Sequence, residues 1–232
     1  MSTLSHVFEA AGIATIVLSS TRSVAERMAN PRTLHCEFPL GRPLGKPGDA
    51  AFQHDVLSRA FALLDESEGP VLIDHPVVIE ADETALSCQI PPRFDADLHP
   101  AVDEAKGIRK AYDRTLEARG VTNVGRSIEA DGIPDAVQIL VDIAGGTPWQ
   151  DAGIPGKNTT SFCHDIRTYY EEAALSLAGV LDGEGEVPAG RAIEAWYFDE
   201  TETGKLVLEA LQVMKDAEAP FPVWFYMVPG HR

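Results

Sequence analysis

Three short apolar runs separated by two helical patterns leave few folds open to the first third of this chain. The runs are "IATIVL" (13–18), "TLHCEF" (33–38) and "VLID" (71–74). The first of them is continuously apolar, which is typical of a strand that is buried on both faces. A short helix ending near Met28 is predicted between the first two runs, and a longer one over residues 50–64 between the second and third. Alternation of strand and helix with short connections predicts an α/β fold: an open, mostly parallel sheet with flanking helices.

The longer helix has a clear beginning and one apolar face. Asp49 is a predicted N-cap, because its carboxylate can accept a hydrogen bond from a free backbone N–H of the first turn. The apolar positions keep the 3.6-residue period of a helix that packs on a sheet. They are Phe52, Val56, Leu57, Ala60, Phe61 and Leu64.

The remainder of the chain is predicted to be rich in helices. "QIPPRFDADLHP" (89–100) has the prolines and polar residues of a linker, so we expect an α/β core over residues 1–95 and a helix-rich part over 98–232. A single domain spanning residues 1–232 is the alternative. Helical periodicity follows in the segments 100–120, 134–144, 159–181 and 188–217. The aromatic run "VWFYMVP" (223–229) is predicted to be a final strand that returns to the sheet.

Charge and composition exclude several classes of partner. The net charge is −17, from 36 acidic and 19 basic side chains, so a phosphate backbone or an anionic lipid surface would repel the chain. We therefore expect neither a nucleic-acid nor a membrane partner, and a cytoplasmic location. The three cysteines form no C-x-x-C pair, and no metal-ligand spacing or nucleotide-binding motif is present. The sequence accordingly predicts no metal and no cofactor.

A loop rich in proline and glycine is the most unusual local feature. "HCEFPLGRPLGKPGD" (35–49) contains two overlapping copies of the pattern P-L-G-x-P. Gly41 and Gly45 occupy equivalent places in the two copies, as do Arg42 and Lys46. Two cations on a stiff loop ahead of a helix suit a carboxylate, so these four residues are candidate substrate contacts. The alternative is a proline-stiffened turn with exposed charges.

The strand before this loop carries three candidate catalytic residues. Side chains alternate along a strand, so His35 and Glu37 share one face while Cys36 lies on the other. The carboxyl ends of strands in open α/β sheets line the ligand crevice, where a histidine beside a glutamate suits proton transfer. Cys36 is a candidate nucleophile, although unpaired cysteine is more often a core residue. A solvated pair at the rim is the alternative for His35 and Glu37.

A second polar cluster lies in "CHDIRTYYEE" (163–172). His164, Asp165 and Arg167 are neighbours on the predicted helix, and Arg167 can form an ion pair with Glu171 four residues later. The cluster either faces a cleft or a partner chain, or is the charged outer face of a helix.

Residues 8–65 resemble a known family. The stretch "FEAAGIATIVLSS" followed by the P-L-G-x-P loop resembles the later part of the component B subunits (selenoprotein B) of glycine, sarcosine and betaine reductases, and of the related D-proline reductase subunit. The matching positions are Gly12, Ile13, Thr15 and Ile16 in the first element and Pro39, Leu40, Gly41 and Pro43 in the loop.

The resemblance implies a partner. Those reductases carry a redox-active selenocysteine or cysteine motif ahead of the matching segment, whereas this sequence has no cysteine before Cys36. We therefore expect one subunit of a two-chain, reductase-like enzyme that helps to form a pocket for a small carboxylate substrate. A second protein chain would supply the reactive thiol or selenol. The alternative is a non-catalytic α/β ligand-binding or scaffold protein.

Overall fold

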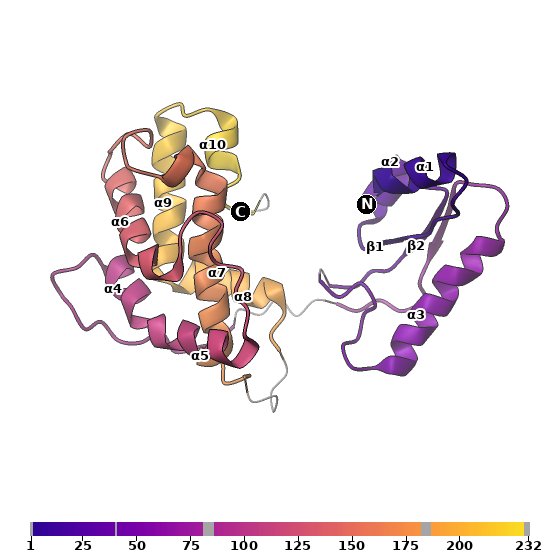
Figure 1. The fold of residues 1–232 in the computed structure, drawn as a ribbon, viewed down its shortest axis with the longest axis horizontal. Coiled ribbons are helices and arrows are strands. Elements are labelled where there is room, and N and C mark those ends of the chain that lie inside the picture. The colour runs from indigo at the N-terminus through magenta and orange to yellow at the C-terminus, as the bar shows by residue number, and fades with distance from the viewer. Residues whose placement is uncertain (1, 40, 81–85, 182–186, 230–232) are drawn as a thin grey trace. The chain divides into compact units, whose positions relative to one another are not determined.

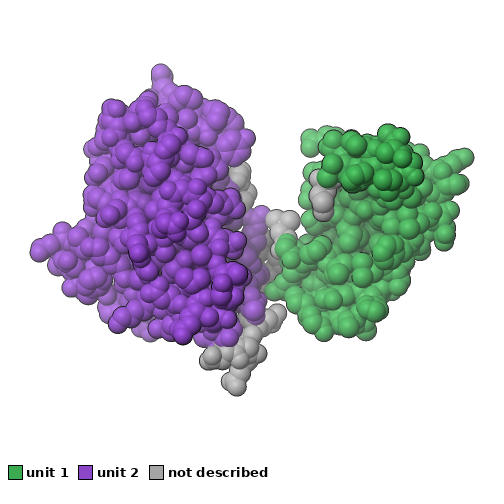
Figure 2. All heavy atoms as spheres, in the orientation of Figure 1, with its two compact units in different colours: residues 1–82 green, residues 83–232 purple. Residues whose placement is uncertain are grey.

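The chain divides into two compact units, each with its own hydrophobic core. A computed structural model describes residues 2–39, 41–80, 86–181 and 187–229. The first unit comprises residues 1–82 and the second residues 83–232 (Figures 1 and 2). The division therefore lies ahead of the boundary that the sequence predicts at residues 95–98.

The first unit is built on a three-stranded parallel sheet, so the chain has the α/β fold that the sequence predicts. Strands β1 (Val17–Ser19), β2 (Arg32–His35) and β3 (Val71–Asp74) lie side by side in chain order. Because all three run in the same direction, their carboxyl ends meet at one edge of the sheet.

Helices cover both faces of this sheet. Helix α1 (Ser2–Ala10) precedes β1, and α2 (Arg22–Met28) connects β1 to β2. Helix α3 (Ala50–Ala62) and the short 3-10 helix η1 (Leu63–Asp65) lie between β2 and β3. Figure 1 shows α1 and α2 on one side of β2 and α3 on the other.

Alternation along β2 decides what packs on each face. Leu34 and Cys36 face α3, where they form a buried cluster with Val56 and Ala60. Leu34 is 1% exposed, and burying such a side chain stabilises the fold by about 1.5–3 kcal/mol. Thr33 and the other residues of opposite alternation face α2. This unit therefore has one apolar face and one face with polar side chains.

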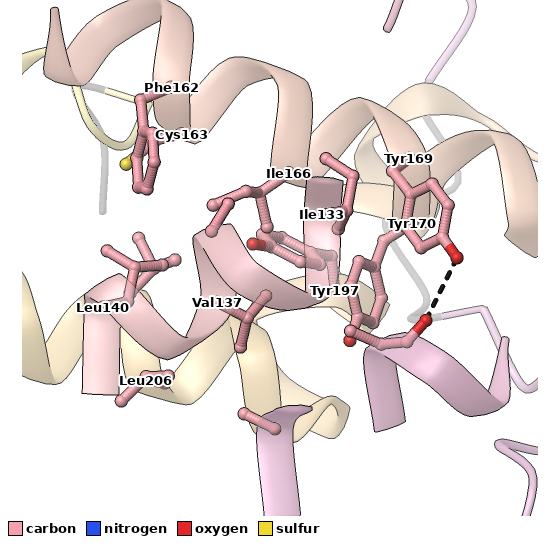
Figure 3. Packing of buried hydrophobic residues seen from close by; sticks show 14 of the residues in the cluster. Ile133, Val137, Leu140, Phe162, Cys163, Ile166, Tyr169, Tyr170, Tyr197 and Leu206 are labelled. Carbon is pink, nitrogen blue, oxygen red and sulfur yellow. Dashed lines mark hydrogen bonds between the residues drawn. The ribbon is translucent and has the colours of Figure 1, made fainter. Parts of the chain in front are cut away.

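The second unit is a bundle of helices around α7. The helices are α4 (Pro100–Gly107), α5 (Arg109–Arg119), α6 (Ile133–Ala144), α7 (Thr159–Leu177), α8 (Gly190–Glu200), α9 (Glu202–Asp216) and α10 (Phe221–Phe225), with the 3-10 helices η2 (Ala130–Gly132) and η3 (Pro155–Lys157). The buried side of α7 carries Phe162, Ile166, Tyr169 and Tyr170, whose spacing follows the helical period (Figure 3).

Buried carboxylates fasten the loops of this bundle to its helices. Asp165 of α7 is fully buried and accepts backbone hydrogen bonds from Arg126, Ser127 and Ile128 at 3.2, 2.6 and 2.9 Å. Glu172, two turns further along α7, accepts a hydrogen bond from the backbone N–H of Asn123 at 2.8 Å. Each carboxylate satisfies backbone donors of the segment 123–128 through charge-assisted hydrogen bonds.

Glu104 of α4 does the same for the beginning of α9. Its carboxylate accepts hydrogen bonds from the backbone N–H groups of Glu202 and Thr203 at 2.9 and 3.0 Å. The hydroxyl of Tyr170 donates to it at 3.0 Å. Asp165, Glu172 and Glu104 therefore stabilise the bundle by accepting hydrogen bonds from backbone N–H groups.

The predicted final strand is wrong. Residues 221–225 form helix α10, which packs in the second unit, and residues 226–229 form no strand. Pro222 in the first turn fits the beginning of a helix, and Trp224 donates its indole N–H to the carbonyl of Ala219. Aromatic residues favour strands on average, and here packing on the bundle outweighs that preference.

Between β3 and α4 the described residues form no strand. Residues 77–80 form no strand, although the N–H of Ile79 donates to the carbonyl of Glu37 at 2.9 Å. Leu86, Cys88 and Ile90 pack on the core of the second unit. The predicted linker after them is held by Asp103, whose carboxylate accepts hydrogen bonds from backbone N–H groups of residues 94–95. In the part of the chain that the structure describes, no helix is long and apolar enough to cross a membrane.

Candidate functional site

A row of polar side chains marks the carboxyl edge of the sheet. Ser19, His35 and Asp74 are the last residues of β1, β2 and β3, and the register pairs them across the three strands. Paired residues of parallel strands point to the same face, so the three side chains lie in one line on the side that α2 covers. Open α/β sheets bind their ligands at this edge.

A small pocket opens at the same edge. Its volume is about 90 Å³, enough for a molecule of a few heavy atoms. The ends of β1 and β2 and the first half of the proline-glycine loop surround it, through Leu18, Ser19, Ser20, Cys36, Phe38, Pro39, Gly41 and Pro43. Ser19 and Ser20 are polar residues of this lining. The Ser19 hydroxyl itself pairs with the backbone of Thr21: it donates to the carbonyl at 3.1 Å and accepts the N–H at 3.3 Å.

The proline-glycine loop is a succession of three turns. The N–H groups of Arg42, Gly45 and Asp49 donate to the carbonyl groups three residues earlier, at 3.0, 2.8 and 3.3 Å. Asp49 then caps α3 as predicted, since its carboxylate accepts the N–H of Phe52 at 3.0 Å. The loop therefore connects the end of β2 directly to the beginning of α3.

The two halves of this loop have different roles. The first half lines the pocket through Gly41, whereas Gly45 in the second half is buried. A Cβ atom on Gly45 would lie 2.4 Å from Phe52 Cε1 and 2.9 Å from Ile79 Cδ1, and its φ of +79° is itself unfavourable for other residues. Gly45 is thus a packing glycine rather than a substrate contact.

Arg42 and Lys46, the two candidate cations, also have different surroundings. Arg42 lies between two residues that line the pocket, and it is half-buried. The ammonium of Lys46 lies 5.1 Å from the centre of the Phe52 ring, on the packed half of the loop. The structure therefore keeps Arg42 close to the pocket and gives Lys46 a contact of its own.

Cys36 lines the pocket but is poorly suited to attack a substrate. It is 2% exposed and belongs to the buried cluster under α3. Burial raises the pKa of its thiol to about 11, which leaves very little thiolate at neutral pH. Burial likewise raises the pKa of Cys88 and of Cys163 to about 12.

His35 finds its carboxylate in Asp74 rather than in Glu37. Its Nδ1 lies 2.9 Å from Asp74 Oδ1, and its side chain is 8% exposed. The side chain of Glu37 is exposed. Glu37 contributes to this edge through its backbone, since its carbonyl accepts a hydrogen bond from the N–H of Ile79. Glu37 lies beyond the end of β2, so only His35 belongs to the polar row.

Arg22 of α2 completes the row. Its guanidinium forms an ion pair with Asp74. The hydrogen bond to His35 and the pairing with Arg22 hold the pKa of Asp74 below its ordinary value. Sequence reasoning missed Asp74 and Ser19, although an acid and a hydroxyl each end a predicted strand. Position at a strand's carboxyl end was the signal that could have found them.

The second candidate cluster is structural. Asp165 is occupied by three backbone N–H groups, and Arg167 pairs with Glu171 at 3.2 Å. His164 lies beside Asp165, and burial together with the positive charge of Arg126 lowers its pKa. The contacts of Asp165 join α7 to the segment between α5 and η2.

Comparison with known proteins gives no relative. No protein-family model matches the sequence, and it finds no match among the curated proteins or the solved structures. Among the described residues, no group of three histidine, cysteine or acidic side chains is placed to hold a metal ion.

Proposed function

We propose that this chain is the pocket-forming subunit of a two-chain, reductase-like enzyme. In this proposal the pocket at the carboxyl edge holds a small carboxylate-bearing substrate, and a partner chain brings the reactive thiol or selenol. The observation that carries the proposal is the small pocket between the end of β1 (Ser19 and Ser20) and the first half of the proline-glycine loop.

The state of the cysteines supports a division of labour between two chains. Each of the three thiols has a pKa raised by burial, so none is a ready nucleophile at neutral pH. A thiol-dependent reaction in this pocket would need its sulfur or selenium from another chain. The resemblance of residues 8–65 to selenoprotein B points to the same arrangement.

Arg42 is the proposed carboxylate contact. Its neighbours Gly41 and Pro43 both line the pocket, and its guanidinium can hold a carboxylate through two hydrogen bonds. Lys46, at the equivalent place in the second P-L-G-x-P copy, lies over Phe52 and serves as a matched control.

A titration followed by NMR tests the pocket. We expect glycine, betaine or D-proline to shift the amide signals of residues 18–20 and 36–43 in the isolated chain. Arg42→Gln should weaken this binding roughly tenfold, about 1.4 kcal/mol, whereas Lys46→Gln should leave it unchanged. Absence of any shift with these three probes would contradict the proposed pocket.

The second candidate function is a non-catalytic ligand-binding or scaffold protein. The packed second half of the loop favours it, because Gly45, Phe38 and Phe52 use this segment as a structural turn. It predicts that the chain works without a second protein. It also predicts that Arg42→Gln has no effect on function.

A further inference from the structure

We propose that Asp74 and Arg22 are positioning residues that hold His35 as a proton acceptor at the carboxyl edge of the sheet. This inference rests on the proposed pocket and adds the acid–base chemistry that would operate beside it. The inference follows from the hydrogen bonds of the His35 ring and from a comparison with His75, the second buried histidine of this unit.

Asp74 determines which nitrogen of His35 carries the proton. An ionised carboxylate only accepts hydrogen bonds, so the neutral imidazole must donate from Nδ1 to Asp74 Oδ1 across 2.9 Å. Nε2 is then left with its lone pair, and it makes no hydrogen bond to any described residue. A neutral histidine in this tautomer can take up a proton at Nε2.

Arg22 keeps Asp74 in the form that this arrangement requires. The guanidinium and the imidazole both contact the Asp74 carboxylate, and an ionised carboxylate can stabilise the imidazolium that forms when His35 accepts a proton. Arg22 also pairs with Glu26 one turn later at 2.9 Å, which anchors the guanidinium on α2.

His75 shows what a purely structural histidine looks like in this fold. Its Nε2 lies 3.3 Å from Asp55 Oδ2, and its Nδ1 accepts the backbone N–H of Val77 at 3.2 Å. Its ring packs edge-on against Phe38 with centroids 5.2 Å apart. Asp55 in turn pairs with Arg59. Both nitrogens of His75 are occupied, whereas His35 keeps one available.

Ser19 connects His35 to the pocket. It lines the pocket and is the register partner of His35 in the neighbouring strand. The two side chains therefore begin about 4.8 Å apart on the same face of the sheet. His35 does not itself line the pocket. In this proposal Nε2 of His35 takes up a proton that leaves a ligand bound at this edge. The ligand's bond to hydrogen breaks, its electron pair stays on the ligand, and an N–H bond forms on His35.

The tautomer of His35 tests the inference directly. In the isolated full-length chain labelled with ¹⁵N-histidine, at a pH where the ring is neutral, we expect the proton on Nδ1 and a lone pair on Nε2. The Asp74→Asn variant should move the proton to Nε2, because the amide can donate to Nδ1. Asp55→Asn is the matched control, and it should change His75 alone.

Each outcome decides the question. A proton on Nε2 of His35 in the unmutated chain would overturn the inference, and so would an unchanged tautomer in a folded Asp74→Asn protein. The measurement on the unmutated chain needs no variant to fold. It also needs no ligand, so its failure is distinct from a failure of the titration that tests the pocket.

Discussion

At the scale of single residues, glycine and cysteine at the loop show how position decides role. Gly41 and Gly45 are equivalent in sequence, yet one borders a pocket and the other is packed under two side chains. Cys36 and His35 are neighbours, yet one is a buried thiol and the other is the middle residue of a polar row. Sequence alternation predicts their opposite faces, but the contacts that separate their roles come from other segments.

The two glycines should respond differently to the same substitution. Gly45→Ala should destabilise the first unit by about 2–4 kcal/mol, because the added methyl meets Phe52 and Ile79 and the backbone is left-handed. Gly41→Ala adds a methyl into open space and should cost only about 1–2 kcal/mol. Amide hydrogen exchange in α3 measures both. Equal effects would contradict the packing role of Gly45.

The three thiols should be slow to react in the native protein. For Cys36, a pKa near 11 against an ordinary 9.0 implies roughly 100-fold less thiolate at neutral pH. Alkylation with iodoacetamide, followed by mass spectrometry, should therefore modify Cys36, Cys88 and Cys163 far more slowly than in urea. Rapid modification of one of them in the folded chain would identify a nucleophile that our account denies.

At the scale of elements, periodicity predicted most of the helices and strands. The strand at residues 71–74 and the helix beginning after Asp49 form as predicted, and Asp49 caps that helix. The strand is less buried than expected, because its first two residues are half-buried and its last two are exposed. Residues 221–225 form a helix instead of the predicted strand, because their packing on the second unit cannot be predicted from local composition. Phe61 shares the predicted apolar face of α3 but is 61% exposed, whereas Ala60 and Leu63 on either side of it are buried.

The hydrogen bonds from Asp165 to residues 126–128 join a loop to α7, and a substitution of Asp165 measures what they contribute to stability. Asp165→Asn should destabilise the second unit by about 3 kcal/mol, because the amide cannot accept from all three backbone N–H groups. Glu171→Gln, on the same helix, breaks only a partly exposed ion pair and should cost about 0.5 kcal/mol or less.

Tryptophan fluorescence during urea unfolding provides the measurement, since Trp149, Trp196 and Trp224 all lie in the second unit. Equal losses in the two variants would show that Asp165 does not fasten the loop.

At the scale of the whole molecule, the two units should respond oppositely to acid. The folded pKa of Asp74 lies below its ordinary 3.8, and that of Glu9 below its ordinary 4.5 because the backbone N–H of Thr15 donates to it. The stability that they give the first unit is complete above those ordinary values. It is lost as the pH falls through the lower folded values.

The pKa of Glu104 shifts in the opposite direction from those of Asp74 and Glu9. Burial raises its pKa above 4.5, so the folded second unit binds this proton more tightly than the unfolded chain. This group therefore makes the second unit more stable as the pH falls through the raised folded pKa toward 4.5. We expect acid to unfold the first unit before the second.

NMR amide signals of residues 17–74 report the first unit, and tryptophan fluorescence reports the second. Glu104→Gln should remove the gain of the second unit, and Asp74→Asn should reduce the loss of the first. Loss of both signals at the same pH would contradict this difference between the units.

The sequence predicted the fold class and the loop, but only part of the candidate site. His35 could be found because it lies in a predicted strand just before an unusual loop. Asp74 is 39 residues away and joins it only when β2 and β3 pair. Arg22 reaches the same carboxylate from α2. Long-range partners of this kind depend on sheet order, which local pattern does not specify.

The central claim is that this chain works with a second chain that carries the reactive group. Native mass spectrometry of the protein, captured gently from its own cells, tests that claim most directly. Our account predicts a stoichiometric complex with a chain containing a reactive cysteine or selenocysteine, and reductase-type turnover by the complex but not by this chain alone. A monomer or homodimer without such a partner, or full turnover by the isolated chain, would contradict it.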